Sequence, residues 1–450
     1  MAKYQKYAEY KDSGVEWVDD IPSTWEVKPV FALFTPEMEK NLDGIETNVL
    51  SLSYGRIIQR DVENNHGLLP ESFNTYQIVN DGDIILRLTD LQNDKRSLRV
   101  GLATQKGIIT SAYLKLSALK EIDPKFAYRL LHSYDTTKVF YGMGGGLRQS
   151  MKFEDFRRLP ILVPPKSEQT QIANFLDHET AKIDSLIAKQ EKLIELLKEK
   201  RQAVISHAVT KGLNPDVNMK DSGVEWLGQV PEHWGIWKFS HIAPIITCGV
   251  ASTPTYVDES EGMPFLSAQN IKNNKLSLHK FNHIPYELHE QLTRYRRPER
   301  GDILVTRVGA GIGEACIVDI DLEFSIYVSL THIRVRPEIA HNKFIMYFFG
   351  TDYCKFLNFD GTVTGGGVGN LNVNNVVKYR IALPTIEEQK QITDYLDNYI
   401  EKQDQLIAKA QSAIQLMQER RTALISSAVT GKIDVRNWQD PNEAKTELSL

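Results

Sequence analysis

The sequence predicts an α+β chain in which two globular domains are separated by two long helices that form an antiparallel coiled coil, with an internal pseudo-two-fold repeat. Three observations predict this fold. The chain repeats two blocks of its own sequence, and each repeat ends in a long run with heptad spacing of apolar residues. The middle of each repeat contains short β-rich runs separated by turn residues.

The repeated blocks mark the start and the end of each half. KDSGVEW occurs at residues 11–17 and again at 220–226, an offset of 209 (220 − 11). A proline and a tryptophan follow each copy: Pro22 and Trp25, then Pro231 and Trp234. ILVPPKSEQTQIANFLD at 161–177 resembles IALPTIEEQKQITDYLD at 381–397, an offset of 220 (381 − 161). A period of about 200 residues indicates a duplicated domain, because solenoid repeats are about 20–50 residues long.

The run that closes each half predicts a long helix. Residues 168–209 contain no Pro or Gly, and a seam of residues seven apart passes through Leu176, Ile183, Gln190, Leu197 and Val204. The second run is similar, and Thr385 with Glu388 fits a capping box at its start. Helices of about 40 residues are roughly 60 Å long. Pairing the two helices within the chain would bury both apolar stripes; the alternative is that each helix packs on its own domain.

The middles predict compact domains of ordinary size. β-rich runs are expected at 83–88, 107–116, 302–308 and 324–335, with helical stretches at 124–133 and 341–349. The expected organisation is a first domain at 1–165, a first long helix at 166–212, a second domain at 213–384 with the repeated segment at 220–239, a second long helix at 385–432, and a tail at 433–450.

Composition excludes several classes of protein. The net charge of −5, from 53 Lys and Arg against 58 Asp and Glu, argues mildly against nucleic-acid binding unless the basic residues cluster. The three cysteines match no zinc-site spacing and suggest a reducing cytosol, so a cytoplasmic location is expected. No signal-peptide pattern opens the chain, and no apolar run approaches the ~18 residues of a membrane span.

The motifs of the common catalytic classes are missing from the sequence. There is no phosphate-binding Walker pattern and no HExxH zinc motif, and Pro164-Pro165 lacks the groups of an amino-methyltransferase motif. The glycine-rich stretches at 142–146 and 361–369 predict loops, because no strand–turn–helix layout surrounds them. No catalytic residue, metal site or cofactor site is therefore predicted in this chain.

Basic and amide-rich clusters in the two middles are candidates for DNA contact. Arg can bridge guanine, Asn and Gln can bridge adenine, and Lys neutralises phosphate, although each single residue can also be an ordinary solvated side chain. The candidates in the first half are Ser53, Arg56, Arg60, Arg87, Arg96, Arg99, Lys106, Arg148, Gln149 and Lys152. The candidates in the second half are Ser267, Gln269, Asn270, Lys272, Arg294, Arg296, Arg297, Arg307, Asn370, Asn372 and Asn374.

The closing blocks and the duplicated KDSGVEW together resemble the specificity subunits of type I restriction-modification systems. The resemblance covers the chain up to about Lys432. It implies that each middle is a target-recognition domain for one half of a split site in double-stranded DNA. It also implies that the helices act as a spacer that docks two methyltransferase subunits, with two motor-endonuclease subunits joining them. S-adenosylmethionine would then bind the methyltransferase partner, and ATP and Mg the motor subunit.

Two other functions stay open from the residues alone. The chain could be a standalone DNA methyltransferase or nuclease, or a coiled-coil scaffold with no DNA role. Duplicated β-rich domains have no evident use in a scaffold, and the motif search argues against the enzyme. The sequence does not give the DNA target, the spacer length, or which residues contact bases.

Overall fold

The computed structural model describes residues 4–62, 72–91, 97–143, 150–309, 311–360 and 371–441. The chain divides into two compact units. Unit 1 combines Met1–Gln190 with Ser412–Leu450, and unit 2 is Glu191–Gln411. Each unit therefore contains a part of both long helices, α4 (Lys166–Lys211) and α10 (Ile386–Val429).

The two units are built on the same four-stranded antiparallel sheet. In unit 1 the strand order is β4 (Phe34–Thr35), β11 (Leu114–Ala118), β8 (Ile84–Leu86), β9 (Val100–Leu102). In unit 2 it is β16 (Ile245–Cys248), β24 (Leu330–Arg334), β21 (Ile303–Thr306), β22 (Ala315–Ile317). In both units the strand that comes fourth in the sequence lies between the first and the second. The two middles therefore share one sheet topology, which their divergent sequences showed only in part.

The repeated blocks form equivalent elements around each sheet. Unit 1 has β1 (Tyr10–Asp12), β2 (Asp20–Pro22), β3 (Glu26–Pro29), α1 (Val30–Leu33), α2 (Pro124–Thr136), η1 (Val139–Gly142), α3 (Phe153–Phe156) and β12 (Pro160–Val163). Unit 2 has β13 (Met219–Asp221), β14 (Gln229–Pro231), β15 (Gly235–Lys238), α5 (Phe239–Ile242), α7 (Asn342–Phe349), α8 (Asp352–Asp360), α9 (Val373–Val376) and β25 (Arg380–Leu383). The strand that precedes each long helix pairs with the strand that follows the repeated tryptophan, as β12–β3 and β25–β15.

The units differ at the edges of their sheets. Unit 1 adds the hairpin β5 (Leu50–Ser53) and β6 (Arg56–Gln59) and the pair β7 (Gln77–Val79) and β10 (Gly107–Ile109). Unit 2 adds η2 (Glu259–Glu261), β17 (Gly262–Leu266), η3 (Ala268–Asn270), β18 (Ile271–Lys272), β19 (Lys275–Leu276), β20 (Asn282–Pro285), α6 (Tyr286–Thr293) and β23 (Ser325–Ile326). The shared elements therefore form a frame, and the unshared ones give each unit its own surface.

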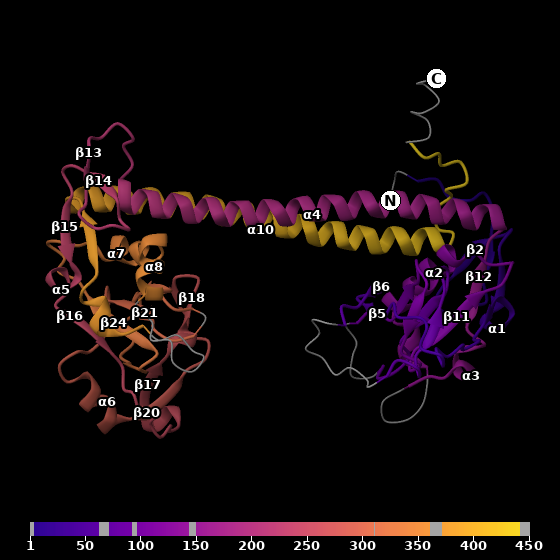
Figure 1. Cartoon of the computed structure of the whole chain (residues 1–450), viewed down its shortest axis with the longest axis horizontal. Coiled ribbons are helices and arrows are strands. Elements are labelled where there is room, and N and C mark those ends of the chain that lie inside the picture. Colours follow the sequence, from indigo (N-terminus) through magenta and orange to yellow (C-terminus); the bar gives the residue numbers. More distant parts are fainter. Residues whose placement is uncertain are drawn as a thin grey trace. The chain divides into compact units, whose positions relative to one another are not determined.

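The long helices pair in opposite directions within each unit, as the heptad pattern predicts, and they lie side by side (Figure 1). In unit 1 the beginning of α4 meets the end of α10, and both contribute to the unit's core through residues such as Ile183 and Ile425. In unit 2 the end of α4 meets the beginning of α10, with Ile205 and Ile392 in the core. Each helix thus packs both on its partner and on a domain.

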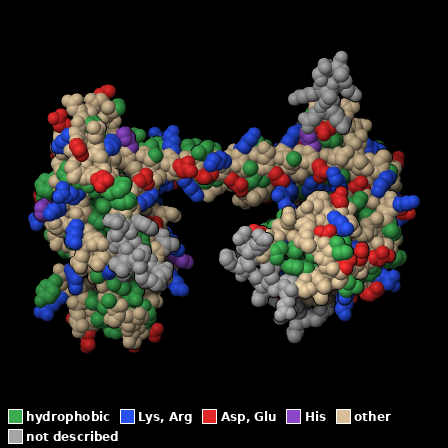
Figure 2. Space-filling view, in the orientation of Figure 1, with side chains coloured by type: hydrophobic (Ala, Val, Ile, Leu, Met, Phe, Trp, Pro, Cys, Tyr) green, Lys and Arg blue, Asp and Glu red, His purple; other side chains and the backbone are tan. Residues whose placement is uncertain are grey.

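Acidic and basic side chains are interspersed along the exposed surface of the helix pair (Figure 2). A glycine follows each long helix directly or after one residue: Gly212, with a φ of 79°, and Gly431, with a φ of 72°. This left-handed conformation is favourable for glycine at a helix C-terminus. No helix in the described ranges is long and apolar enough to cross a membrane.

A segment before β1 and a segment after α10 come together in unit 1. The backbone N–H of Asp434 donates to the carbonyl of Gln5 at 2.8 Å, and the ring of Trp438 packs against Phe175 at a centroid distance of 5.6 Å. In unit 2 the corresponding route from α4 to β13 is continuous chain through Gly212. The residues after the second long helix therefore complete unit 1 up to at least Trp438.

Candidate nucleic-acid interface

A repeated glutamate fixes the repeated tryptophan at the start of each long helix. The indole N–H of Trp25 donates to Glu168 Oε1 at 3.0 Å, and that of Trp234 donates to Glu388 Oε1 at 3.1 Å. Both indoles are fully buried, so each needs a hydrogen-bond partner. The capping box expected at Thr385 is half formed: Thr385 Oγ1 accepts the N–H of Glu388 at 3.3 Å, but the Glu388 carboxylate binds Trp234 instead of capping the backbone.

The glutamine that follows this glutamate ties each long helix to its domain. Gln169 Oε1 accepts the backbone N–H of Asp123 at 2.7 Å, and its Nε2 donates to the carbonyls of Glu121 and Pro164 at 3.0 and 2.8 Å. In unit 2, Gln389 makes the same three bonds, to His341 N–H at 2.7 Å and to the carbonyls of Ile339 and Pro384, both at 3.0 Å. Both glutamines are fully buried.

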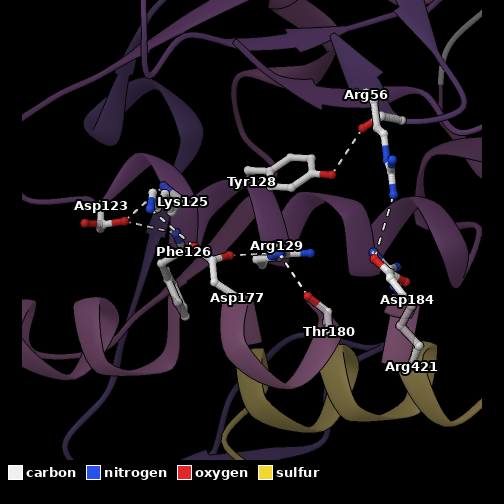
Figure 3. Close-up of polar contacts among 11 residues, drawn as sticks. Arg56, Asp123, Lys125, Phe126, Tyr128, Arg129, Asp177, Thr180, Asp184 and Arg421 are labelled. Carbon is white, nitrogen blue, oxygen red and sulfur yellow. Dashed lines mark hydrogen bonds and ion pairs between the residues drawn. The ribbon is translucent and has the colours of Figure 1, made fainter. Parts of the chain in front are cut away.

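A repeated aspartate makes the third attachment. Asp177 receives Arg129 at 2.8 Å and Lys125 at 3.3 Å, both from α2 (Figure 3). Its counterpart Asp397 receives Lys343 at 2.6 Å and the hydroxyl of Tyr347 at 2.5 Å, both from α7. Burial and then the hydrogen bond to Asp397 raise the pKa of Tyr347, so this hydroxyl stays a donor. The glutamate, glutamine and aspartate that recur at the start of each long helix therefore attach that helix to its domain in both units.

The two long helices are joined by equivalent ion pairs. Arg421 Nε lies 2.9 Å from Asp184 Oδ1 in unit 1, and an Arg201 nitrogen lies 2.6 Å from Asp404 Oδ1 in unit 2. The partners are related by the same offset of 220 as the closing blocks (404 − 184 and 421 − 201). These pairs fix the register of the antiparallel helices in both units.

Unit 1 brings a basic hairpin against this helix pair. The turn between β5 and β6 has positive φ at Tyr54 and Gly55, and Tyr128 donates to the Gly55 carbonyl at 3.1 Å. Arg56 extends from the turn to within 3.7 Å of Asp184 (Figure 3). A cavity of about 370 Å³ lies beside it, lined by Gly55, Arg56, Ile57, Leu102, Thr104, Lys125, Tyr128, Arg129 and Asp177.

Unit 2 places a different basic hairpin beside the helices. Its two turn residues, Asn273 and Asn274, both have positive φ, and exposed Lys272 and Lys275 flank them. Cavities of about 820 and 750 Å³ lie beside the turn and share Arg201 in their walls. In both units, then, a cationic turn faces the segment of the helix pair that carries the cross-helix ion pair.

A second cluster of unit 2 lies at the end of α6. Arg294, Tyr295, Arg296 and Arg297 are all exposed, and the Arg294 guanidinium lies over the Tyr295 ring at 5.3 Å. Arg297 pairs with Glu323 at 2.9 Å, and Arg296 donates to the Thr247 hydroxyl. Within the described residues these three exposed guanidinium groups have one carboxylate partner, Glu323, so the cluster suits an anionic ligand such as a DNA backbone.

Arg99 is unsuited to the DNA contact expected of it, because its side chain is fully buried. Its guanidinium donates to the carbonyls of Arg87, Thr89 and Asp90 at 3.2, 2.7 and 3.1 Å, and Nε donates to Tyr141 Oη at 3.2 Å. The five donors of an arginine suit a chain segment whose carbonyls converge. Arg99 therefore holds the segment after β8 in place.

Asn270 is also internal, with 1% of its surface exposed. Its amide accepts the N–H of Ser267 at 2.9 Å and donates to the carbonyls of Ser277 and Lys280, both at 2.9 Å, so it fixes the base of the unit 2 hairpin. Arg307 is half-buried, and its Nε donates to the Leu371 carbonyl at 2.7 Å. Asn372 caps α9 by accepting the N–H of Asn374 at 2.9 Å.

The other candidates divide by exposure. The exposed ones are Arg56, Lys106, Lys152, Gln269, Lys272, Arg294, Arg296, Arg297 and Asn374. The half-buried ones are Ser53, Arg60, Arg87, Ser267, Arg307 and Asn372. Arg96, Arg148, Gln149 and Asn370 lie outside the described residues, as do most of the two glycine-rich stretches. Lys125, which lines the cavity beside the unit 1 hairpin, is not among the residues that the sequence predicts.

Among the described residues no group of three or more His, Cys, Asp or Glu side chains is placed to hold a metal ion. One chain of polar side chains has the residue types of a hydrolase: His289 lies 2.9 Å from both Ser325 Oγ and Glu323 Oε1. His289 and Ser325 are 3% and 1% exposed, and Glu323 is also paired with Arg297. This buried network joins α6 to β23 and is a packing element.

Comparison with known proteins gives a family. The model of the type I restriction modification DNA specificity domain matches residues 51–196 and 231–416. The type I restriction enzyme MjaVIII specificity subunit of Methanocaldococcus jannaschii is 24% identical over 371 residues, which cover 80% of this chain and 81% of that protein.

Two solved structures share the fold. A chain solved in work on complex assembly and conformational transition of the type I R-M system matches with a TM-score of 0.68 at 15% identity, covering 91% of this chain and 98% of that one. The HsdS subunit from Thermoanaerobacter tengcongensis matches with a TM-score of 0.51 at 16% identity, covering 92% and 98%.

Proposed function

This chain belongs to the type I restriction-modification DNA specificity family, and we propose that it reads a split DNA target with one half-site bound by each unit. The observation that carries the proposal is that the two units share a framework but differ in the elements at the edges of their sheets. The same sheet order and the same glutamate, glutamine and aspartate attachments recur in both units, whereas the elements at the sheet edges differ. A chain that holds two different surfaces in equivalent positions suits a target made of two different halves.

The proposed reading surfaces are the exposed candidates at these edges. In unit 1 they centre on Arg56 and Lys106, and in unit 2 on the β18–β19 turn and the arginines after α6. Phosphate contacts from Lys and Arg would make binding fall steeply with salt. Arg, Gln and Asn side chains that reach base edges would supply the sequence preference. The net charge of −5 would limit binding to DNA that lacks the target.

Catalysis is assigned to partners in this proposal. Two methyltransferase subunits with S-adenosylmethionine would dock on the chain and methylate adenine, and two motor-endonuclease subunits with ATP and Mg would join for restriction. Methylation of a base inside a duplex requires that the base be flipped out of the stack, and the methyltransferase partner would capture it. This chain would supply the position on the DNA.

We also propose that the helix pair sets the number of unread base pairs between the half-sites. α4 has 46 residues and α10 has 44, so each is roughly 65–70 Å long at ~1.5 Å per residue. The test is a matched deletion of residues 188–194 and 411–417, which lie between the two cross-helix ion pairs. A heptad keeps the apolar seam in phase and removes about 10 Å.

The methylated motif should then have a shorter spacer, by up to about three base pairs at ~3.4 Å per base pair. The control keeps the length and replaces only exposed side chains of the same segments with alanine. If the deletion variant still methylates the original spacing, the helices do not act as a ruler.

Methylome sequencing of cells with and without this chain tests the function as a whole. A split motif that is methylated only when the chain is present supports the proposal, and an unchanged methylome contradicts it. Transfer of label from S-adenosylmethionine to DNA by the pure chain would instead support a standalone methyltransferase. A gel shift with the methyltransferase partner separates a DNA reader from a scaffold, because a scaffold would leave the partner's DNA preference unchanged.

A further inference from the structure

The Asp184 carboxylate on α4 is shared by two arginines from different parts of unit 1. Arg421 of α10 approaches it with two nitrogens, at 2.9 and 3.5 Å, and its side chain is 24% exposed. Arg56 approaches from the β5–β6 turn at 3.7 Å, and its side chain is 73% exposed. Figure 3 shows the two guanidinium groups meeting Asp184 from the hairpin and from α10.

The charges do not balance at this point. Arg421 alone matches the charge of Asp184, so Arg56 is a surplus cation. Lys125 and Arg129 likewise share the single carboxylate of Asp177. The neighbourhood is electropositive: burial, followed by the charges of Arg421 and Arg129, lowers the pKa of His132 to about 4. An exposed ion pair at 3.7 Å is also weak, because water and salt screen it.

The other half of the chain shows that the frame does not require this third cation. In the equivalent pair, Asp404 binds Arg201 at 2.6 Å, and within the described ranges no other Lys or Arg is in ion-pair contact with Asp404. The β18–β19 hairpin of unit 2 packs on β22 as the β5–β6 hairpin packs on β9, so Lys275 takes the position of Arg56 directly after the turn. Arg56 therefore makes an ion pair with the helices that the hairpin of unit 2 does not make within the described residues.

The residues around Arg56 form a candidate binding site for an anion. Its backbone turn is held by the bond from Tyr128 to Gly55, so the guanidinium starts from a fixed point. The cavity of about 370 Å³ opens beside it, with Lys125 and Thr104 also in its wall. Lys125 is 59% exposed and lies 3.3 Å from its carboxylate partner, so a second cation can turn to the same ligand.

We propose that a phosphate of the DNA backbone binds at this cavity and takes Arg56 from Asp184, so that Arg56 exchanges between the helix pair and the DNA. This rests on the proposed function, since it names one contact of the DNA-reading unit. In the free chain Asp184 restrains Arg56 near the helices. In the complex Arg56 and Lys125 neutralise the phosphate, and Arg421 continues to pair with Asp184, so the helix register is kept.

The exchange predicts that substitutions of Arg56 and of Asp184 change DNA affinity in opposite directions. Arg56→Ala should weaken binding of the methylated-motif duplex about 3- to 10-fold and lower the slope of log affinity against log salt by about 0.9, as loss of one phosphate contact does. A scrambled duplex should lose affinity by a similar factor, because phosphate contacts carry no sequence information. Asp184→Asn should strengthen binding about 2- to 3-fold, because Arg56 is no longer restrained.

The repeat supplies the matched control. Asp404→Asn removes the same charge from the equivalent ion pair but restrains no further arginine, so its effect measures the charge change alone. The gain from Asp184→Asn should exceed that of Asp404→Asn, and the excess should vanish in the Arg56→Ala background. Thermal unfolding of each variant shows whether the helix pair is intact. If Asp184→Asn has a lowered Tm, Arg56→Gln replaces it as the test, because that variant removes the charge of Arg56 and leaves the pair of Arg421 with Asp184 unchanged.

The experiment uses fluorescence anisotropy of labelled duplexes with the full chain and its methyltransferase partner, over a series of salt concentrations. Failure of the unaltered complex to prefer the motif duplex would refute the proposed function itself. Motif preference with an unchanged salt slope in Arg56→Ala would refute only the exchange. Equal losses of DNA affinity in Arg56→Ala and Asp184→Asn would show that the Arg56–Asp184 ion pair only stabilises the fold. If Arg56→Ala lost binding to the methyltransferase partner in the absence of DNA, the anion at this cavity would belong to the partner protein.

Discussion

Replacing Gln169 with methionine tests the idea that the repeated glutamine fastens each domain to its helix. Methionine has a similar volume and no amide, so the substitution removes hydrogen bonds with little change in packing. It leaves three backbone groups without their partner, the N–H of Asp123 and the carbonyls of Glu121 and Pro164. An orphaned buried group costs about 1–3 kcal/mol, and partial hydration reduces the sum, so the expected loss is about 3 kcal/mol.

The loss should be confined to unit 1. At ~1.4 kcal/mol per tenfold change, about 3 kcal/mol corresponds to a roughly 100-fold faster amide exchange where local opening limits it. Hydrogen–deuterium exchange of peptides covering 121–131 and 339–349 reports on α2 and α7 separately. Gln169→Met should speed exchange in the first peptide, and Gln389→Met in the second, with Gln405→Met as an exposed control. Equal changes in both peptides, or changes below about threefold, would refute the fastening role.

Two further predictions concern unit 1. Because burial and then Arg421 and Arg129 lower the pKa of His132 to about 4, the unfolded chain binds the extra proton first. Stability should therefore fall as pH drops from about 6.5 towards 4, by on the order of 3 kcal/mol, and urea titrations of His132→Phe should show a flatter pH dependence over this range. Arg99→Met should destabilise unit 1 by about 2–4 kcal/mol in the same assay, because three carbonyls lose their donor, whereas exposed Lys106→Met should stay within about 0.5 kcal/mol. A stable Arg99→Met variant with weakened DNA binding would reverse the structural assignment of Arg99.

The frame could be predicted from the sequence because the repeat acts as an internal comparison. The spacing of 220 aligns Glu168 with Glu388 and Gln169 with Gln389, and the periodicity predicts helices within two residues of those observed at the start and end of α4. The contacts that these repeated residues make could not be predicted from the sequence. The partners of Gln169 are backbone groups, which leave no trace in residue identity, and Trp25 is 143 residues away from the carboxylate that it binds.

The candidate surface was harder to predict because residue type does not determine burial. Gln269 and Asn270 are neighbours of similar chemistry, yet Gln269 is exposed and Asn270 is 1% exposed, since the short helix η3 turns one amide outwards and the other into the loop that it holds. Arg99 and Arg56 differ in the same way. Arg99 follows a segment whose carbonyls converge on it, whereas Arg56 leaves a two-residue turn at the surface.

The repeat also helps to separate the two kinds of residue, once the fold is known. A side chain whose counterpart makes the same contact, such as Asp177 with Asp397, serves the frame, because both halves need the frame equally. A charged side chain whose counterpart makes a different contact serves something that only one half contacts. Arg56 is an example, because it pairs with Asp184, whereas Lys275 makes no ion pair with Asp404 among the described residues. Two different half-sites demand this asymmetry, since identical surfaces on a two-fold frame would select a palindrome. DNA-contacting residues should therefore be concentrated among the exposed cations and amides that break the repeat, and substitutions there should change the preferred motif while leaving the helix register and the fastenings intact.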